Sequence, residues 1–167
     1  MKSNALLPCL LIALAAALAG CGKDESGTPS ASSPDSPFSE NAKALANALN
    51  HNDTATLRRL LQNGINPNIV LLDGTTVLHA AAGMGRTECV RLLLAHGADV
   101  NIVSPRGNPL HFATRYSQDN SDIVHLLLDA GVKLDAKDSN GNTPLDNARK
   151  NNLEQSVELI EKAVKKK

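Results

Sequence analysis

The sequence predicts an all-α solenoid of about four stacked helix-turn-helix units with short β-turn fingers, and two recurring phrases carry this prediction. The first phrase is RLLQNGINPN at residues 59–68, LLLAHGADVN at 92–101 and LLLDAGVKLD at 126–135. The second is GTTVLHAAA at 74–82, GNPLHFAT at 107–114 and GNTPLDNAR at 141–149. One unit of this size cannot bury its apolar face alone, so neighbouring units must stack and share a core.

Composition agrees with a single helical domain and excludes several functions. The 167 residues include 17 basic and 17 acidic side chains, so the formal net charge is zero and the broad cationic field of nucleic-acid binding proteins is missing. One Tyr, two Phe and no Trp are too few for a base-stacking platform. We therefore expect no nucleic-acid partner.

Residues 1–20 form an export signal rather than part of the fold. Lys2 precedes an apolar run from Ala5 to Ala19, which is shorter than the roughly 20 residues of a membrane-spanning helix. The run ends in Leu18-Ala19-Gly20-Cys21, which resembles the lipobox of bacterial lipoprotein precursors. The resemblance implies cleavage before Cys21, with a diacyl (palmitate-type) anchor on its sulfur and acylation of the new amino end. The alternative is an ordinary secretory signal with an incidental cysteine.

Two features after Cys21 refine the predicted location. In lipoproteins of Gram-negative bacteria an aspartate at the next position tends to retain the protein in the inner membrane, so Gly22 favours the outer membrane, facing the periplasm. Residues 21–38 contain mostly Gly, Ser, Pro and acidic residues and have little to bury. We expect this segment to be a disordered tether between the lipid and the folded domain, residues 39–167.

Four units follow, at residues 39–70, 71–103, 104–137 and 138–164. Ser39 is placed to cap the first helix, ALANALN, and the first unit lacks a finger. The second unit contains a helix over Thr87–Ala95 with an apolar stripe, and Gly97 follows as the left-handed residue that ends it. The third unit has a finger one residue shorter and extra residues at 116–120. The fourth ends in a lysine-rich tail, which either complements the helix dipole or touches an acidic surface.

The 33-residue period and the TPLH-x-A phrase resemble ankyrin repeats over about residues 39–164. By this resemblance His79 and His111 hydrogen-bond between turns and neighbouring repeats, and Asp146 replaces the histidine in the last unit. The repeat glycines, 33 and 34 residues apart, are Gly64, Gly97 and Gly131.

No catalytic constellation is found in the sequence. The histidines lack His-x-x-His spacing, the cysteines lack Cys-x-x-Cys spacing, and neither a phosphate loop nor a Gly-x-Ser-x-Gly elbow occurs. The resemblance to lipoprotein precursors implies that Cys9 leaves with the signal and that Cys21 carries lipid, so Cys89 would remain alone, and we expect it to be buried and inert. We expect no enzyme, no metal, no cofactor and no small-molecule substrate.

In the ankyrin family, recognition uses the finger tips and the exposed face of the first helices. Mapping the motif predicts helix-face positions at His51, Met84, Tyr116 and Asn151. The predicted partner-binding residues are Val70, Leu72, Asp73, Met84, Val103, Arg106, Arg115, Tyr116, Lys137 and Asn140. Residues 69–72 (IVLL) are unusually apolar for a finger tip; they either pack on the first repeat or the next finger, or form a contact patch.

These observations favour a membrane-anchored, non-enzymatic interaction module, expected to be a monomer that docks or regulates an envelope protein in the periplasm. One alternative is an immunity-type inhibitor of a toxin delivered into the periplasm. Another is a structural spacer between the outer membrane and the cell wall, although no segment resembles a glycan-binding motif.

Overall fold

The computed structural model describes residues 39–115 and 120–166. The predictions for the signal (1–20), for Cys21 and the tether (21–38), and for Tyr116 lie outside these residues. The described part contains eight helices in four consecutive pairs, which confirms the predicted all-α solenoid. They are α1 (Glu40–Asn50), α2 (Thr54–Gln62), α3 (Val77–Gly83), α4 (Thr87–Ala95), α5 (Pro109–Ala113), α6 (Ser121–Asp129), α7 (Pro144–Lys150) and α8 (Glu154–Lys165).

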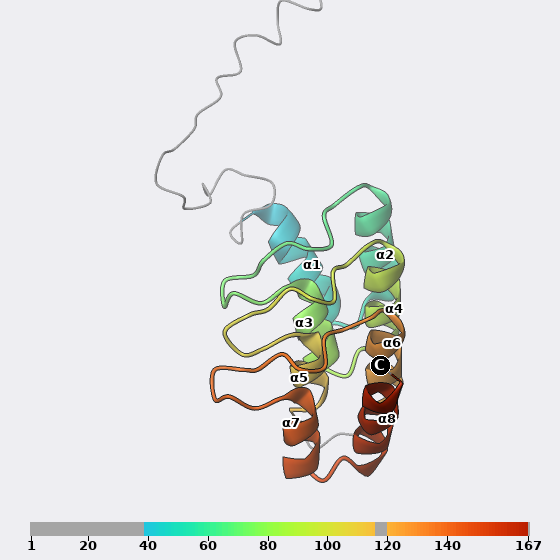
Figure 1. Ribbon diagram of the computed structural model, residues 1–167. Coiled ribbons are helices and arrows are strands. Elements are labelled where there is room, and N and C mark those ends of the chain that lie inside the picture. Colours follow the sequence, from blue (N-terminus) through green and yellow to red (C-terminus); the bar gives the residue numbers. More distant parts are fainter. Residues whose placement is uncertain (1–38, 116–119, 167) are drawn as a thin grey trace, which may run out of the picture. The chain divides into compact units, whose positions relative to one another are not determined.

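The helices form two columns (Figure 1). The odd-numbered helices make an inner column, the even-numbered helices make an outer column, and three hairpin fingers project from the side of the inner column. The fingers precede α3, α5 and α7. This arrangement places the finger tips and the inner helices on one continuous face.

Local signals in the sequence set where helices begin and end. The Ser39 hydroxyl accepts the N–H of Ala42 at 3.2 Å, and the Asp53 carboxylate accepts the N–H of Thr56 at 2.9 Å, so each side chain satisfies a free donor in a first helical turn. Glycines in the left-handed conformation follow α2, α4 and α6, where any other residue except Asn would be strained. The helix predicted over Thr87–Ala95 is observed with those limits.

The core lies between the two columns and runs the length of the array. Buried Leu, Ile and Val side chains from both columns form a single cluster, with Leu45, Leu78 and Leu110 contributed by successive inner helices. The buried Ala81 and Ala82 on α3 let neighbouring helices approach closely. Cys89 is also fully buried, as predicted, and burial raises the pKa of its thiol.

Each finger is a short hairpin closed by backbone hydrogen bonds. In the first finger the N–H of Leu71 donates to the carbonyl of Thr75 at 2.6 Å, and Val70 pairs with Thr76. The shorter second finger pairs Ser104 with Gly107. Within the residues that the structure describes, no helix is long and apolar enough to cross a membrane.

Candidate partner-binding surface

Two buried histidines connect the first finger to the second and the second finger to the third through hydrogen bonds. Nδ1 of His79 lies 3.1 Å from the backbone nitrogen of Thr76, and Nε2 lies 3.2 Å from the carbonyl oxygen of Gly107. Since Nδ1 accepts the N–H of Thr76, the ring hydrogen resides on Nε2 and is donated to Gly107. His111 repeats this geometry, with Nδ1 at 3.1 Å from the Asn108 nitrogen and Nε2 at 3.1 Å from the carbonyl oxygen of Asn142.

Burial keeps both imidazoles neutral. Desolvation lowers the pKa of His79 from 6.5 to about 4, against the opposing effect of its hydrogen bond to Gly107. The pKa of His111 is lowered for the same reason. The neutral ring is the form that accepts one hydrogen bond and donates another, so the fingers are held by bonds that require uncharged histidine.

Asp146 occupies the corresponding position in the last unit. Its carboxylate accepts the N–H of Thr143 at 2.9 Å and the Thr143 hydroxyl at 2.7 Å, and these bonds lower its pKa. A carboxylate is shorter than an imidazole and has no second ring nitrogen. Asp146 therefore caps the first turn of α7 through Thr143 and has no second ring nitrogen for a bond of the kind that His79 and His111 make to the next finger.

A second set of inter-repeat bonds comes from asparagines that the sequence analysis did not single out. Asn68 accepts the N–H of Asp99 at 2.8 Å, and Asn101 accepts the N–H of Lys133 at 2.9 Å. Both residues end the first recurring phrase and lie 33 residues apart, so this recurrence in the sequence could have indicated their role between repeats. Together with the histidines they fix the spacing of successive fingers.

The apolar stretch at residues 69–72 divides between core and surface. Ile69 is buried, Leu71 is half-buried, and the side chains of Val70 and Leu72 are 41% and 69% exposed. The alternation follows from the hairpin, in which successive side chains point to opposite faces. Ile69 and Leu71 therefore pack as one of the two alternatives has it, and the contact of a partner with the exposed Val70 and Leu72 stays a prediction.

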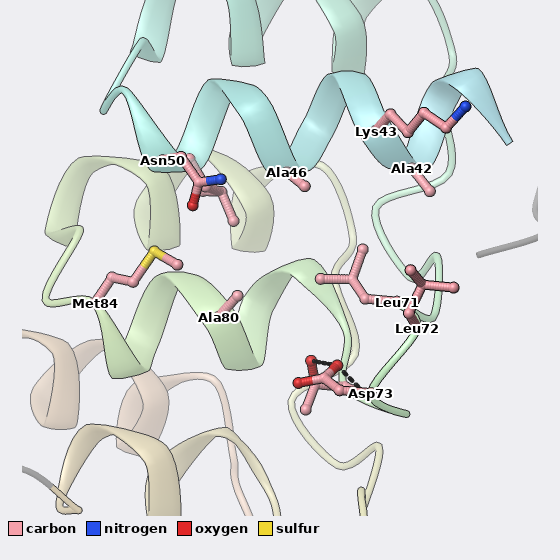
Figure 2. A pocket seen from close by; sticks show the side chains of 11 residues that line it. Ala42, Lys43, Ala46, Asn50, Leu71, Leu72, Asp73, Ala80 and Met84 are labelled. Carbon is pink, nitrogen blue, oxygen red and sulfur yellow. Dashed lines mark hydrogen bonds between the residues drawn. The ribbon is translucent and has the colours of Figure 1, made fainter. Parts of the chain in front are cut away.

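A mainly apolar groove of about 330 Å³ lies between α1, α3 and the first finger. Figure 2 shows Ala42 and Ala46 projecting from α1 toward Ala80 and Met84 on the α3 side, with Leu71, Leu72 and Asp73 at the finger end. The alanines create the space, because a larger side chain at any of these positions would fill the gap. The remaining lining residues are Lys43, Leu49, Asn50 and Thr75.

The groove continues along the inner column. A second hollow of about 270 Å³ shares Asp73, Thr75, Ala80 and Met84 with the first and ends at Phe112 on α5. Phe112 is buried, and its ring packs edge-on against His79 with the ring centres 5.1 Å apart. The aromatic side chain occupies the position on α5 that Ala80 occupies on α3, and so it closes the groove.

The structure gathers some of the predicted partner-binding residues and separates others. Leu72, Asp73 and Met84 line the groove. Val103, 55% exposed, and Arg106 lie on the second finger, and a 4.0 Å contact joins Arg106 Nη1 to Asp73 Oδ2. Val70 is exposed on the first finger but does not line the groove. Lys137, Asn140 and Arg115 lie further along the array, the first two exposed and the third half-buried after α5.

Asn151 does not serve as a free contact on the helix face. Its amide donates to the carbonyl oxygens of Thr114 at 2.8 Å and Arg115 at 2.9 Å, so the side chain satisfies the end of α5 instead. His51 and Met84, the other two described helix-face positions, are exposed.

The groove is lined mainly by apolar side chains, with one carboxylate at its finger end. Among residues 39–115 and 120–166, no group of three or more His, Cys, Asp or Glu side chains is placed to hold a metal ion. The carboxylate in the groove, Asp73, accepts the hydroxyl of Thr75 at 2.6 Å and its N–H at 3.1 Å. This arrangement offers apolar contact and one fixed negative charge.

Comparison with known proteins places the chain in a family. The family model for ankyrin repeats in three copies matches residues 14–104 and 44–138. Ankyrin repeat and SOCS box protein 11 from Pongo abelii is 32% identical over 121 residues, 72% of this chain and 37% of that protein. The Danio rerio protein of the same name is 35% identical over 61% of this chain and 34% of its own length. Cyclin-dependent kinase 4 inhibitor B from Rattus norvegicus is 35% identical over 61% of this chain and 78% of that protein.

The chain spans about a third of the length of the SOCS box relatives that it matches. The family match at residues 44–138 covers helices of both columns and the first two fingers. Ankyrin repeats generally mediate protein–protein interactions and are generally not catalytic. The chain therefore belongs to the ankyrin repeat family.

Proposed function

We propose that this protein is a non-enzymatic interaction module, anchored by lipid in a bacterial cell envelope, that docks or regulates another protein through its finger tips and inner helix face. The observation that carries the proposal is the apolar groove between α1, α3 and the first finger. Exposed apolar side chains clustered around a hollow are typical of a protein-binding site.

The rigidity of the fingers supports this function. The rings of His79 and His111 and the amides of Asn68 and Asn101 connect consecutive repeats through backbone groups. A surface held in its binding conformation loses less conformational entropy when a partner docks, and this raises affinity.

The anchor is supported by the sequence alone. Leu18-Ala19-Gly20-Cys21 matches the lipoprotein processing motif, and Gly22 favours transfer to the outer membrane, with the repeats in the periplasm. Each buried methylene contributes about 0.8 kcal/mol, so two or three acyl chains hold a protein firmly where one would not.

Site-specific photo-crosslinking in living cells tests the docking surface. A photoreactive amino acid is placed at Leu72, Met84 or Val103 in the full chain, and at His125 on the outer face of α6 as the matched control. All four side chains are exposed, so the replacement should leave the fold intact. We expect one adduct of the same mass from the first three positions and none from His125. Adducts from His125 alone, or from no position in folded protein, would contradict the proposal.

The anchor requires a separate test. In cells that are fed an alkyne-labelled palmitate, the wild-type chain should become labelled and the variant Cys21→Ser should not. The variants Cys9→Ser and Cys89→Ala are the controls and should keep it, because Cys9 lies in the signal and Cys89 is buried. Label that persists in Cys21→Ser would refute the lipid anchor and leave the docking surface untouched.

A second candidate function, inhibition of an incoming toxin, has one observation in its favour. A relative that this chain covers to 78% of its length is by name a kinase inhibitor, so an array of this size suffices to inhibit an enzyme. Once the cross-linked partner is identified, its activity with and without an equimolar amount of this chain decides the direction. Loss of activity indicates an inhibitor, and unchanged or raised activity indicates an accessory factor.

A further inference from the structure

We propose that the groove between α1 and α3 binds a segment of a partner protein that carries an aliphatic side chain with a lysine or arginine beside it. The inference rests on the proposed docking function and specifies the chemistry of the partner. Three features carry it: where the apolar surface lies, how large the groove is, and which charge stands inside it.

The exposed apolar surface is concentrated at one end of the array. In the described part of the chain the exposed large hydrophobic side chains are Val70, Leu72, Met84, Val103 and Val164. The first four belong to the first two fingers and the end of α3. The third finger instead presents exposed Lys137, Ser139 and Asn140. An apolar anchor therefore binds at the first two fingers.

The dimensions of the groove limit what enters it. A volume of about 330 Å³ is at the small end of the roughly 300–1,000 Å³ of ligand-binding pockets. Ala42 and Ala46 on α1 line the groove opposite Ala80 on α3, and Phe112 lines its continuation toward α5. One or two aliphatic side chains fit this space. A whole helix would lie across the rim and insert only those side chains.

The charge inside the groove is negative. Oδ1 of Asp73 is bonded to Thr75, whereas Oδ2, within the described residues, makes a 4.0 Å contact with Arg106. Both side chains of this pair are about half exposed, so the contact is loose and screened by solvent. Burial raises the pKa of Asp73, but the bonds from Thr75 outweigh burial and the net pKa is lowered. A partner cation therefore meets an ionised carboxylate.

The lysine that lines the groove on the α1 side forms its ion pair with Glu40 and not with Asp73. Lys43 Nζ pairs with Glu40 Oε1 at 2.7 Å. Figure 2 shows the ammonium group of Lys43 directed away from Asp73. The groove thus combines apolar walls with a carboxylate oxygen at its finger end, which a partner cation can reach in place of the loose contact with Arg106.

Charge argues against two other occupants. The chain's own residues 21–38 contain Asp24, Glu25 and Asp35 against one Lys23, so this segment is acidic and is repelled by Asp73. A second copy that docked through its own first two fingers would bring a second Asp73 to the groove, and like charges oppose that pairing. Val164 on α8 has lysines beside it, so self-association through that end is the outcome that the variant Val164→Glu tests. We assign the groove to a partner protein.

A phage-displayed library of random twelve-residue peptides, selected on the detergent-solubilised full chain, tests the proposal. We expect enrichment of Leu, Ile or Met within a few positions of Lys or Arg. A synthetic peptide of the enriched sequence should bind about tenfold more weakly to Asp73→Asn and to Met84→Glu, and unchanged to the control Val164→Glu. Replacing the basic residue of the peptide by norleucine should remove the difference between wild type and Asp73→Asn.

Several results would overturn the inference. Enrichment of acidic or uncharged peptides, or equal binding to the groove variants, refutes the stated chemistry. Self-association of the chain that is lost in both Met84→Glu and Val164→Glu assigns the groove to a second copy. Competition by a synthetic 21–38 peptide assigns it to the tether. If the protein cross-linked at Leu72 in cells lacks the enriched motif, this inference is refuted and the docking function stands. If peptides with the motif are selected but no cross-link forms in cells, the docking function is refuted.

Discussion

Acid should destabilise the repeat array in a pH range above that of its carboxylates, because His79 is buried as the neutral ring. Its pKa is 6.5 in an unfolded chain and about 4 in the folded protein. The unfolded state therefore binds more protons between these values, and the stabilisation is complete above pH 6.5 and lost as the pH falls toward 4. At pH 4.5 the linkage relation predicts a loss of about 2 to 3 kcal/mol from this residue.

The geometry gives this loss a physical cause. Protonation of Nδ1 replaces an acceptor by a donor that faces the backbone N–H of Thr76, 3.1 Å away. His111 shifts in the same direction and adds to the effect. The carboxylates with lowered pKa, such as Asp146 and Glu158, also stabilise the folded state less as the pH falls through their ordinary values of 3.8 and 4.5, so most of their effect lies below that of the histidines.

Urea unfolding followed by circular dichroism at pH 7.5, 5.5 and 4.5 measures the dependence. We expect a lower midpoint at each step, and a shallower dependence in His79→Asn. Because that variant loses several buried hydrogen bonds and could unfold, the wild-type ring resonance of His79 is titrated by NMR as an independent check. Stability that stays flat from pH 7.5 to 4.5, or a ring that titrates near 6.5, would refute the reasoning.

Three further predictions concern the free energy of unfolding at neutral pH. Gly107→Ala should lower the free energy of unfolding by about 3 kcal/mol or more, because the residue has φ +100° and a Cβ would lie 2.5 Å from the ring of His111. Gly97→Ala, where φ is +84° and the space around the Cβ is open, should lower it by about 1 kcal/mol. Equal urea midpoints for the two variants would contradict this prediction. Ser39→Ala should cost about 1 kcal/mol through loss of the N-cap, with Ser39→Thr nearly neutral, and an unchanged melting temperature in the alanine variant would count against the cap. Asn151→Ala should cost about 2 kcal/mol by leaving two carbonyls at the end of α5 without their donor, and Asn151→Asp, which cannot donate, should not rescue the denaturation midpoint.

The sequence was sufficient for the fold because the repeat period is a long-range signal. Two phrases in register set the order of helices and turns, so even the limits of the helix at Thr87–Ala95 were predicted correctly. The cap at Ser39 and the burial of Cys89 followed from local rules in the same way. Each of these features depends on residue type and spacing alone.

The groove was beyond sequence reasoning for a physical reason. It exists because Ala42 and Ala46 on one helix face Ala80 on another, and the distance between the two helices is set by the core beneath them. The family resemblance placed Val70 and Leu72 at a finger tip, but the sequence left open whether residues 69–72 pack or are exposed, since four consecutive apolar residues do not reveal the phase of a two-residue alternation. The asparagines at 68 and 101 were readable from their recurrence, because they end the same phrase in successive units.

The finger that lines the groove and the network that stabilises the array share residues. Asp73 faces the groove and Thr75 bonds to it, while the adjacent Thr76 bonds to His79, which bonds in turn to the second finger. Any change that weakens the hydrogen bonds of the buried His79 ring should therefore also loosen the first finger, which carries Leu72. Reduced partner binding in a His79 variant or at low pH is consequently no evidence that the histidine touches the partner. Only surface substitutions that leave the unfolding midpoint unchanged, such as those at Met84, separate contact from support.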